Sequence, residues 1–321
     1  MNFLFLMDPL HTVHPQKDTT LALMVGAHER GHRVFFLPEG GMTRHGAATL
    51  FNVVSLKPSF DPTRMFNDQQ KQVLQEQEVD AIFVRNDPPF DQEYLISTWL
   101  LELLPKYIAI INDPQGIRTV NEKIWVTQFT DLIPPTSVSR NKHDILSFIQ
   151  QQGDVVAKPT DGFGGQSVFH VRKADTNRNV ILETLSKNWS REIIVQSFVA
   201  QAKDGDKRIL LLNGEALGAV LRVQEEDDHR HNFFAGGKPH QAHISKRDTQ
   251  IIEALKPHLL SLGLYFVGID MLGDFLIEVN VTSPTCLREM NELYSLRLHH
   301  NIVEFAEKLV EKKRQTHTIK A

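Results

Sequence analysis

The pattern of short apolar runs around one helical segment at the start of the chain constrains its fold most. Residues 3–7 are an apolar run of strand length, residues 33–37 form a second strand-length run that is apolar after Arg33, and residues 18–30 carry apolar side chains at helical spacing up to Gly31. Strand, helix and strand at this spacing are typical of a βαβ unit, whose strands lie parallel in one sheet. The sequence therefore predicts a parallel sheet at the N-terminus.

Later patterns predict two further regions of mixed structure. Helices are expected over 93–104, from 121–123 to the break at 131–135, and over 144–152, 247–262 and 301–312. Strands are expected over 81–84, 107–111, 154–158, 168–171 and 193–199, with hairpins at Asn213-Gly214 and Gly273-Asp274. Residues 38–66 read as irregular or short antiparallel pieces. We expect an α/β domain over 1–118, followed by α+β regions over 119–200 and 201–321.

Composition excludes several classes of protein. A chain of 321 residues is long enough for two or three domains, and its net charge of −4 argues against a nucleic-acid partner. Its single cysteine cannot form an intrachain disulfide, which fits a reducing compartment. The N-terminus lacks the basic start and long apolar run of a signal peptide, and no apolar stretch approaches membrane-spanning length. We therefore expect a cytoplasmic protein with no membrane partner.

The end of a strand near residue 280 predicts a metal site. Glu278 and Asn280 are two residues apart, so their side chains lie on one face of the strand. Their oxygen atoms are hard ligands that suit Mg²⁺. A two-residue turn at Gly273-Asp274 would place Asp270 opposite Ile277, on the wrong face. We therefore predict an odd loop or a bulge centred near Asp274, which brings Asp270 opposite Glu278. The alternative is that these are solvated acids at the end of a strand.

A lysine followed by a glycine-rich segment predicts a phosphate-binding flap. Lys158 ends a predicted strand, and residues 160–167 contain Gly162, Gly164 and Gly165. Glycines let successive backbone N–H groups approach an anion closely. The segment is not a Walker A loop, because its lysine precedes the glycines. A flexible hairpin tip is the alternative reading, although the lysine upstream and the strand downstream favour the flap.

Other polar positions are candidates for substrate contacts. Arg85, Asp87 and Asp91 follow the strand over 81–84, at the edge where open α/β sheets bind ligands, although a structural turn would also explain them. In the later hairpin, Asp206 could bind a ribose, and Arg208 and Arg222 could bind anionic oxygens. Residues 223–243 are polar and suggest a mobile lid.

Histidine and cysteine give weaker signals. Loop histidines at 229, 231, 240 and 243 are irregularly spaced, so transition-metal binding there is disfavoured. His299 and His300 are expected on a helix, pointing in different directions. Cys286 is better explained as a small buried hydrophobe than as a nucleophile.

Several motifs together resemble the bacterial-type glutathione synthetases of the ATP-grasp superfamily. The resemblance runs in order along nearly the whole chain. The matching motifs are Asp87-Pro88-Pro89-Phe90-Asp91, Asn121-Glu122-Lys123, Lys158-Pro159 with Asp161-Gly162, Lys203–Arg208, and Asn280–Glu289 with its Asn-Val-Thr-Ser-Pro-Thr-Cys. The resemblance implies a pre-ATP-grasp N-terminal domain followed by a two-subdomain ATP-grasp fold that clamps ATP.

The resemblance also implies an activity: ATP-dependent ligation of γ-glutamylcysteine to glycine through an acyl phosphate. It further implies Mg²⁺, with Mn²⁺ as a possible substitute, and a homodimer or homotetramer. ATP would be bound by Lys123, Lys158, Gly162, Gly164, Gly165, Ser197, Phe198, Val199 and Asp206, and metal by Asp270, Glu278 and Asn280. Catalysis would involve Arg208, Arg222 and Arg230, and substrate would contact Arg85, Asp87, Ser283, Pro284, Thr285, Cys286 and Arg288.

One segment departs from the family pattern. Where the family usually has a glycine-rich stretch, residues 224–229 read Gln-Glu-Glu-Asp-Asp-His. Two alternatives follow: a related ATP-grasp ligase with a different acceptor, or an ATP-binding regulatory protein without turnover.

Overall fold

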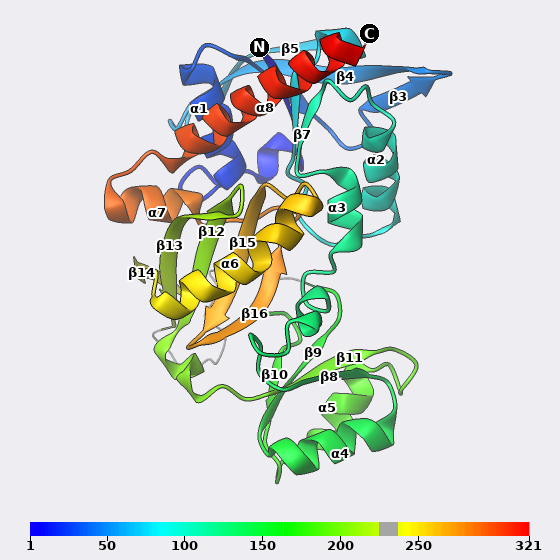
Figure 1. The fold of residues 1–321 in the computed structure, drawn as a ribbon, viewed down its shortest axis with the longest axis vertical. Coiled ribbons are helices and arrows are strands. Elements are labelled where there is room, and N and C mark those ends of the chain that lie inside the picture. The colour runs from blue at the N-terminus through cyan, green and yellow to red at the C-terminus, as the bar shows by residue number, and fades with distance from the viewer. Residues whose placement is uncertain (163, 225–236, 321) are drawn as a thin grey trace.

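The computed structural model describes residues 1–162, 164–224 and 237–320, which form three sheets (Figure 1). The parallel part of the first sheet, sheet A, contains β1 (Asn2–Leu6), β2 (Arg33–Leu37), β6 (Ala81–Val84) and β7 (Ala109–Ile111). The predicted βαβ unit is confirmed, with α1 (Thr19–Glu29) as its crossover helix. Residues 38–66 are more regular than expected, because antiparallel strands β3 (Met42–His45), β4 (Ala48–Pro58) and β5 (Phe66–Gln75) extend the sheet.

Helices cover both faces of sheet A because consecutive residues of its central strands are apolar, so that both faces carry buried side chains. Phe3 and Phe5 pack toward α1 and the long closing helix α8 (Leu298–Lys320), whereas Leu4 and Leu6 share a core with α2 (Gln92–Glu102) and α3 (Pro114–Thr119). Short 3₁₀ turns lie at Leu10–Thr12, Glu76–Glu78, Trp125–Gln128 and Ala200–Asp204. The predicted helix from residue 121 is therefore wrong, since only the turn at Trp125–Gln128 forms there.

The second sheet, sheet B, is antiparallel and has a core of its own. Its strands are β8 (Thr136–Ser139), β9 (Val155–Pro159), β10 (Phe169–Val171) and β11 (Ile193–Ser197), in the order β10-β9-β11-β8. Two helices, α4 (Lys142–Gln152) and α5 (Arg178–Leu185), supply Ile145, Ile149 and Leu182 to its core. Sheet B and its helices lie at the end of the molecule opposite sheet A in Figure 1.

The third sheet, sheet C, lies between the other two (Figure 1). Its order is β14-β13-β12-β15-β16, with β12 (Asp206–Leu212), β13 (Glu215–Val223), β14 (Lys238–Gln241), β15 (Phe266–Leu272) and β16 (Phe275–Asn280). One face packs on α6 (Lys246–Ser261) through Ile209 and Leu255. On the other face, Leu210 and Val220 share a core with Met290 of α7 (Leu287–Tyr294).

Among the residues that the structure describes, sheet C shares its hydrophobic cores with sheet A, whereas the core of sheet B is separate. The core that contains Leu4 also contains Ile209, and the core that contains Phe3 also contains Leu210. No helix in the described part of the chain is both long and apolar enough to cross a membrane.

Candidate active site

A cavity of about 240 Å³ lies where sheets B and C meet the loop after β6. Most of the residues predicted to form the site line this cavity. They are Asp87, Lys123, Lys158, Gly162, Gly164, Gly165, Ser197, Phe198, Val199, Asp206, Arg208, Arg222, Asp270, Glu278, Asn280, Ser283 and Thr285. Arg230 lies outside the described residues, as does most of the segment 224–229.

The hairpin of β15 and β16 brings Asp270 opposite Glu278, as expected, but by a different route. The turn is a plain two-residue turn, because Leu272 pairs with Phe275. The pairing then shifts, so that Met271 is opposite Leu276 and Asp270 is opposite Glu278. The expected bulge near Asp274 is therefore wrong in position: the extra residue is Ile277. This bulge keeps both carboxylates on the cavity face.

Four charged side chains on the cavity face of sheet C form a chain of ion pairs. Arg208 donates to both carboxylate oxygens of Asp270, at 2.7 and 2.6 Å. Arg222 donates to both oxygens of Asp206, each at 2.6 Å, and its Nη2 lies 3.0 Å from Asp270. The pairs form because Arg208 is directly opposite Asp270, and Asp206 directly opposite Arg222, in the strand register. Forked pairs of this kind fix each guanidinium strongly.

The pKa values of the two facing carboxylates, Asp270 and Glu278, are shifted in opposite directions. Burial alone would raise the pKa of Asp270, but Arg208 and Arg222 hold that pKa well below its usual range. Burial and then the charge of Asp270 raise the pKa of Glu278, although Lys123 opposes the shift from 3.6 Å. Two carboxylates that share one site favour a bound cation, because it offsets their repulsion.

The donor atoms of this pair and its neighbour fit a divalent cation. The side-chain nitrogen of Asn280 is 3.4 Å from the carbonyl of Gly268, to which it donates, so the oxygen is the atom of the amide that can bind a cation. Gly268 is opposite Asn280, and a Cβ at Gly268 would lie 3.1 Å from Cβ of Pro284 and 3.7 Å from Arg208. Carboxylate and amide oxygens on one face are the ligands that Mg²⁺ and Mn²⁺ take.

Two lysines face these acids from the other side of the cavity. The ammonium of Lys123 donates to the carbonyl of Gly162 at 2.6 Å, which ties it to the glycine-rich segment. Lys158 is buried, and its ammonium is 3.4 Å from the side-chain oxygen of Gln196. Burial lowers the pKa of Lys158 to about 8, against the opposing effect of Glu278. Gly162, Gly164 and Gly165 all have positive φ, between 64° and 93°, which glycine adopts without strain.

The far end of the cavity is apolar and aromatic. Phe198 stacks on His170, with ring centroids 4.1 Å apart and planes inclined by 11°. Val156, Val199 and Leu272 also line this cavity. A flat, apolar surface of this kind suits a purine base.

Several residues predicted to contact substrate instead support the loop that follows β16. Arg85 is 4% exposed and donates to Thr20 Oγ1 and to the carbonyl of Pro284, each at 3.0 Å. Cys286 is fully buried, as expected of a hydrophobe, and burial raises the pKa of its thiol. Arg288 lies over the ring of Phe60 at 4.1 Å. Arg85, Pro284, Cys286 and Arg288 do not line the cavity, so their assigned contacts stay predictions.

Asp91 has a structural role as the N-cap of α2, where its carboxylate accepts from the backbone of Tyr94 at 3.0 Å. Other cavity residues were not predicted as site residues from the sequence, among them Glu122, Gln196 and Thr282. Glu122 was part of a recognised motif, but nothing in local sequence indicated which strand it would meet.

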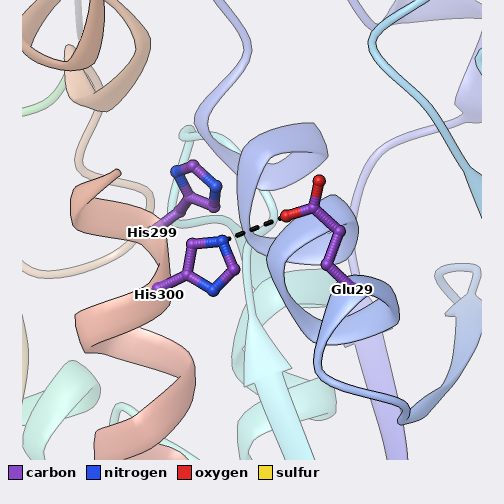
Figure 2. A group of neighbouring side chains, drawn as sticks. All are labelled: Glu29, His299 and His300. Atoms are coloured by element: carbon purple, nitrogen blue, oxygen red, sulfur yellow. Dashed lines mark hydrogen bonds and ion pairs between the residues drawn. The ribbon is translucent and has the colours of Figure 1, made fainter. Parts of the chain in front are cut away.

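A second group of polar side chains, Glu29, His299 and His300, lies between α1 and α8 (Figure 2). The two imidazole rings are 4.6 Å apart, so the prediction that they point in different directions is wrong. Asn291 Oδ1 accepts from the backbone of Leu298, so its Nδ2 donates to His299 Nδ1 at 3.0 Å. The remaining nitrogen of neutral His299 then carries the proton and cannot ligate a metal. Glu29 also pairs with Arg297 and with His300.

Comparisons with known proteins give the same family over both parts of the chain. Residues 1–118 match the model of the prokaryotic glutathione synthetase N-terminal domain, and residues 122–295 match that of the prokaryotic glutathione synthetase ATP-grasp domain. A glutathione synthetase of Pseudomonas aeruginosa is 38% identical over 300 residues, covering 93% of this chain and 95% of the relative. One of Gloeobacter violaceus is 38% identical over 313 residues, covering 95% and 96%.

Solved structures with similar folds include the ATP-grasp ligase PsnB, with a TM-score of 0.61 at 13% identity. D-cycloserine synthetase DcsG has a TM-score of 0.65 at 14% identity, covering 96% of this chain and 99% of its own. The macrocyclase MdnC of Microcystis aeruginosa has a TM-score of 0.64 at 16% identity, covering 97% and 100%. At such low identity these structures establish the fold alone.

Proposed function

The chain belongs to the prokaryotic glutathione synthetase family, and from this membership we propose that it is an ATP-dependent ligase that joins γ-glutamylcysteine to glycine. The products are glutathione, ADP and phosphate. One observation carries the proposal beyond family membership. The same cavity is lined by Asp270, Glu278 and Asn280, which offer carboxylate and amide oxygens, and by the lysines Lys123 and Lys158. Phosphoryl transfer from ATP needs both kinds of group together.

The chemistry explains why ATP is needed. The cysteinyl carboxylate is a poor acyl donor, and transfer of the γ-phosphoryl group to it gives an acyl phosphate. The glycine amine then attacks the carbonyl carbon, and phosphate leaves. Lys123 and Lys158 hold the nucleotide phosphates, while Arg208 and Arg222 offset negative charge on the transferring group and on the tetrahedral intermediate.

ATP-grasp enzymes use ATP with a divalent metal, and we assign Mg²⁺ to this chain, with Mn²⁺ as a substitute. When bound, the cation neutralises phosphate charge and orients the γ-phosphoryl group. Asp270, Glu278 and Asn280 would hold it. The support is the hard-oxygen donor set on one face of the β15–β16 hairpin.

The remaining roles follow the same assignment. Ser197, Phe198 and Val199 border the adenine, with the ring of Phe198 as the supporting surface. Asp206 binds the ribose. Its carboxylate then accepts from a ribose hydroxyl as well as from Arg222. Asp87, Ser283 and Thr285 line the cavity where the peptide would lie. We retain Arg85, Pro284, Cys286, Arg288 and Arg230 as peptide-site and catalytic assignments.

We also propose the division into regions 1–118, 119–200 and 201–321. Sheets A, B and C fall within these three ranges, although α8 returns to pack on α1 of the first region. A cytoplasmic location and a homodimer or homotetramer complete the proposal.

The experiment that tests the function is phosphate release from ATP and Mg²⁺ with γ-glutamylcysteine, with and without glycine. Glycine-dependent release with glutathione as the product is expected. Release with another amine and none with glycine would show a different acceptor, as the acidic segment 224–229 suggests. Tight ATP binding with no release would favour a regulatory ATP-binding protein.

A further inference from the structure

Glu122 makes an unusually complete set of hydrogen bonds to the end of β16 and the loop after it. Its Oε1 atom accepts from the backbone of Val281 at 2.8 Å, the backbone of Thr282 at 3.2 Å and the hydroxyl of Thr282 at 2.9 Å. Its backbone carbonyl accepts from the backbone of Val279 at 3.0 Å. One residue therefore binds both neighbours of Asn280.

We infer that Glu122 is a positioning residue, which holds Asn280 and the loop 281–285 in the geometry that the reaction needs. The inference rests on the proposed function for the metal site that contains Asn280 and for its activity readout. Held on both sides, the peptide of Asn280 cannot rotate without breaking a hydrogen bond to Glu122. Asn280 and Glu278 are two residues apart in β16, so their side chains lie on the same face of the strand. Residues that orient metal ligands without touching the metal commonly have this role.

The buried side chain of Asn112 holds the next peptide group, between Val281 and Thr282, through its carbonyl. Asn112, which follows β7, is 3% exposed and donates to the carbonyl of Val281 at 2.9 Å. The same amide bonds the backbone of Phe266 in β15 in both directions, each at 2.7 Å. Both the N–H and the carbonyl of Val281 are therefore fixed by side chains from elsewhere in the chain.

The position of Glu122 in the chain explains how one residue can coordinate several parts of the site. The next residue, Lys123, bonds the glycine-rich segment at Gly162 and lies 3.6 Å from Glu278. The stretch from Glu122 to Leu132 also covers the free edge of β16, because the carbonyl of Leu132 accepts from the backbone of Leu276 at 2.8 Å. The phosphate side, the metal face and the peptide loop thus meet at residues 122–123.

The three contacts of Oε1 need an acceptor at the right distance and do not by themselves need a negative charge. Glu122→Gln keeps an acceptor oxygen in place without the charge. Glu122→Asp keeps the charge but is one methylene too short to reach Val281 and Thr282. The two variants therefore separate positioning from a direct electrostatic or metal-binding role.

The first measurement is Mn²⁺ binding in the presence of ADP, followed by electron paramagnetic resonance of free Mn²⁺. We expect Glu122→Asp to weaken Mn²⁺ binding about tenfold or more, in the range usual for residues that support metal ligands. Glu122→Gln should stay within about threefold of the unmodified chain. Glu183→Asp is the matched control and should behave like the unmodified chain, because Glu183 is a partly exposed glutamate on α5 that pairs with Lys142.

Steady-state kinetics supply the second measurement. Glu122→Asp should raise KM for γ-glutamylcysteine and lower kcat, with a smaller change in KM for ATP, because the loop 281–285 borders the peptide region. Thermal unfolding of each variant shows whether it is folded. If Glu122→Asp does not fold, Thr282→Val removes one of the three bonds and should give a weaker effect in the same direction.

The outcomes either support or overturn the inference. A loss of Mn²⁺ affinity in Glu122→Gln as large as that in Glu122→Asp would overturn the inference, because it would mean that the charge of Glu122 acts directly. Unchanged Mn²⁺ binding in a folded Glu122→Asp variant would equally overturn positioning. The Mn²⁺ result stands without turnover, so a different acceptor would overturn the proposed function and leave this test intact.

Discussion

The two walls of the cavity differ in how their charges are compensated. On sheet C, Arg208, Arg222, Asp206 and Asp270 neutralise one another through forked pairs between adjacent strands. On sheet B, the ammonium of Lys158 is buried beside the neutral side chain of Gln196 at 3.4 Å. The charges on sheet C are thus compensated by neighbouring opposite charges. The charge of Lys158 on sheet B is buried without such a contact, which costs free energy.

The difference indicates a division of labour. Buried ions that are paired and hydrogen-bonded keep their positions, and removing one member leaves another exposed to the full cost of burial. A buried cation without a partner of opposite charge in contact gains more from an incoming anion. Sheet C is therefore suited to fixing geometry, and Lys158 to binding phosphate. Sheet B also has a separate core, so it can move without disturbing that of sheet C.

The largest effect is expected for Glu278→Ala. It removes an oxygen ligand from the cavity face, and turnover should fall by about a thousandfold or more because a preorganised charge-stabilising group is lost. The fold should persist, since Glu278 lies at the end of β16. Initial rates and circular dichroism check both statements. A variant that retains full activity would refute the assigned metal site.

Stability should distinguish the two walls directly. Arg222→Ala leaves Asp206 without its forked partner and removes one of the two guanidinium groups beside Asp270. The free energy of unfolding should therefore fall by about 3 kcal/mol. Lys158→Met removes a buried charge while keeping the length of the side chain, so stability should be unchanged or rise by about 1 kcal/mol. Urea unfolding measures both. Equal losses in the two variants would remove the contrast between the walls.

The pH dependence of ATP binding should report Lys158. Its pKa is lowered from 10.5 to about 8, so its positive charge disappears as the pH rises through that value. KM for ATP should increase roughly tenfold between pH 7 and pH 9, following the protonated fraction. Lys158→Arg keeps its charge and should show a flatter profile. An identical rise in this variant would assign the titration to another group.

The lowered pKa of Lys158 also makes the free energy of unfolding depend on pH. Between pH 8 and pH 10.5 the unfolded chain binds more protons at Lys158 than the folded chain does. The contribution of this group to the free energy of unfolding therefore rises with pH across that window, and the full penalty is present below pH 8. Comparing Lys158→Met with the unmodified chain at both ends of the window isolates this contribution.

The smallest effect is expected from the acidic segment. Replacing residues 224–229 with glycine-rich sequence should change KM for the acceptor by a few-fold, roughly as expected of a lid contact, and KM for ATP by less. Kinetics with glycine and ATP varied in turn provide the test. A larger change in KM for ATP would mean that the segment is not an acceptor lid.

Much of the fold could be predicted because its signals are local. The βαβ start follows from apolar runs, and the Asn213-Gly214 hairpin follows from residues that adopt positive φ readily. Strand β5 escaped prediction because its sequence, FNDQQKQVLQ, is almost entirely polar and its side chains are mostly exposed. Helix α7 was not predicted, since its first three residues were recognised only as the end of the motif Asn280–Glu289.

Sequence alone determined most of the chemical inventory of the site: two lysines, two arginines, four acids, an amide and a glycine-rich segment. It also predicted that Asp270 and Glu278 face each other, but only with an extra residue in the hairpin, because plain alternation would place Asp270 opposite Ile277. Only the tertiary structure decided that the register shifts at Ile277, which follows from pairing across the whole hairpin. Likewise, only packing between distant segments brought Glu122 and Asn112 to Val281, because hydrogen bonds across more than a hundred residues leave no local pattern.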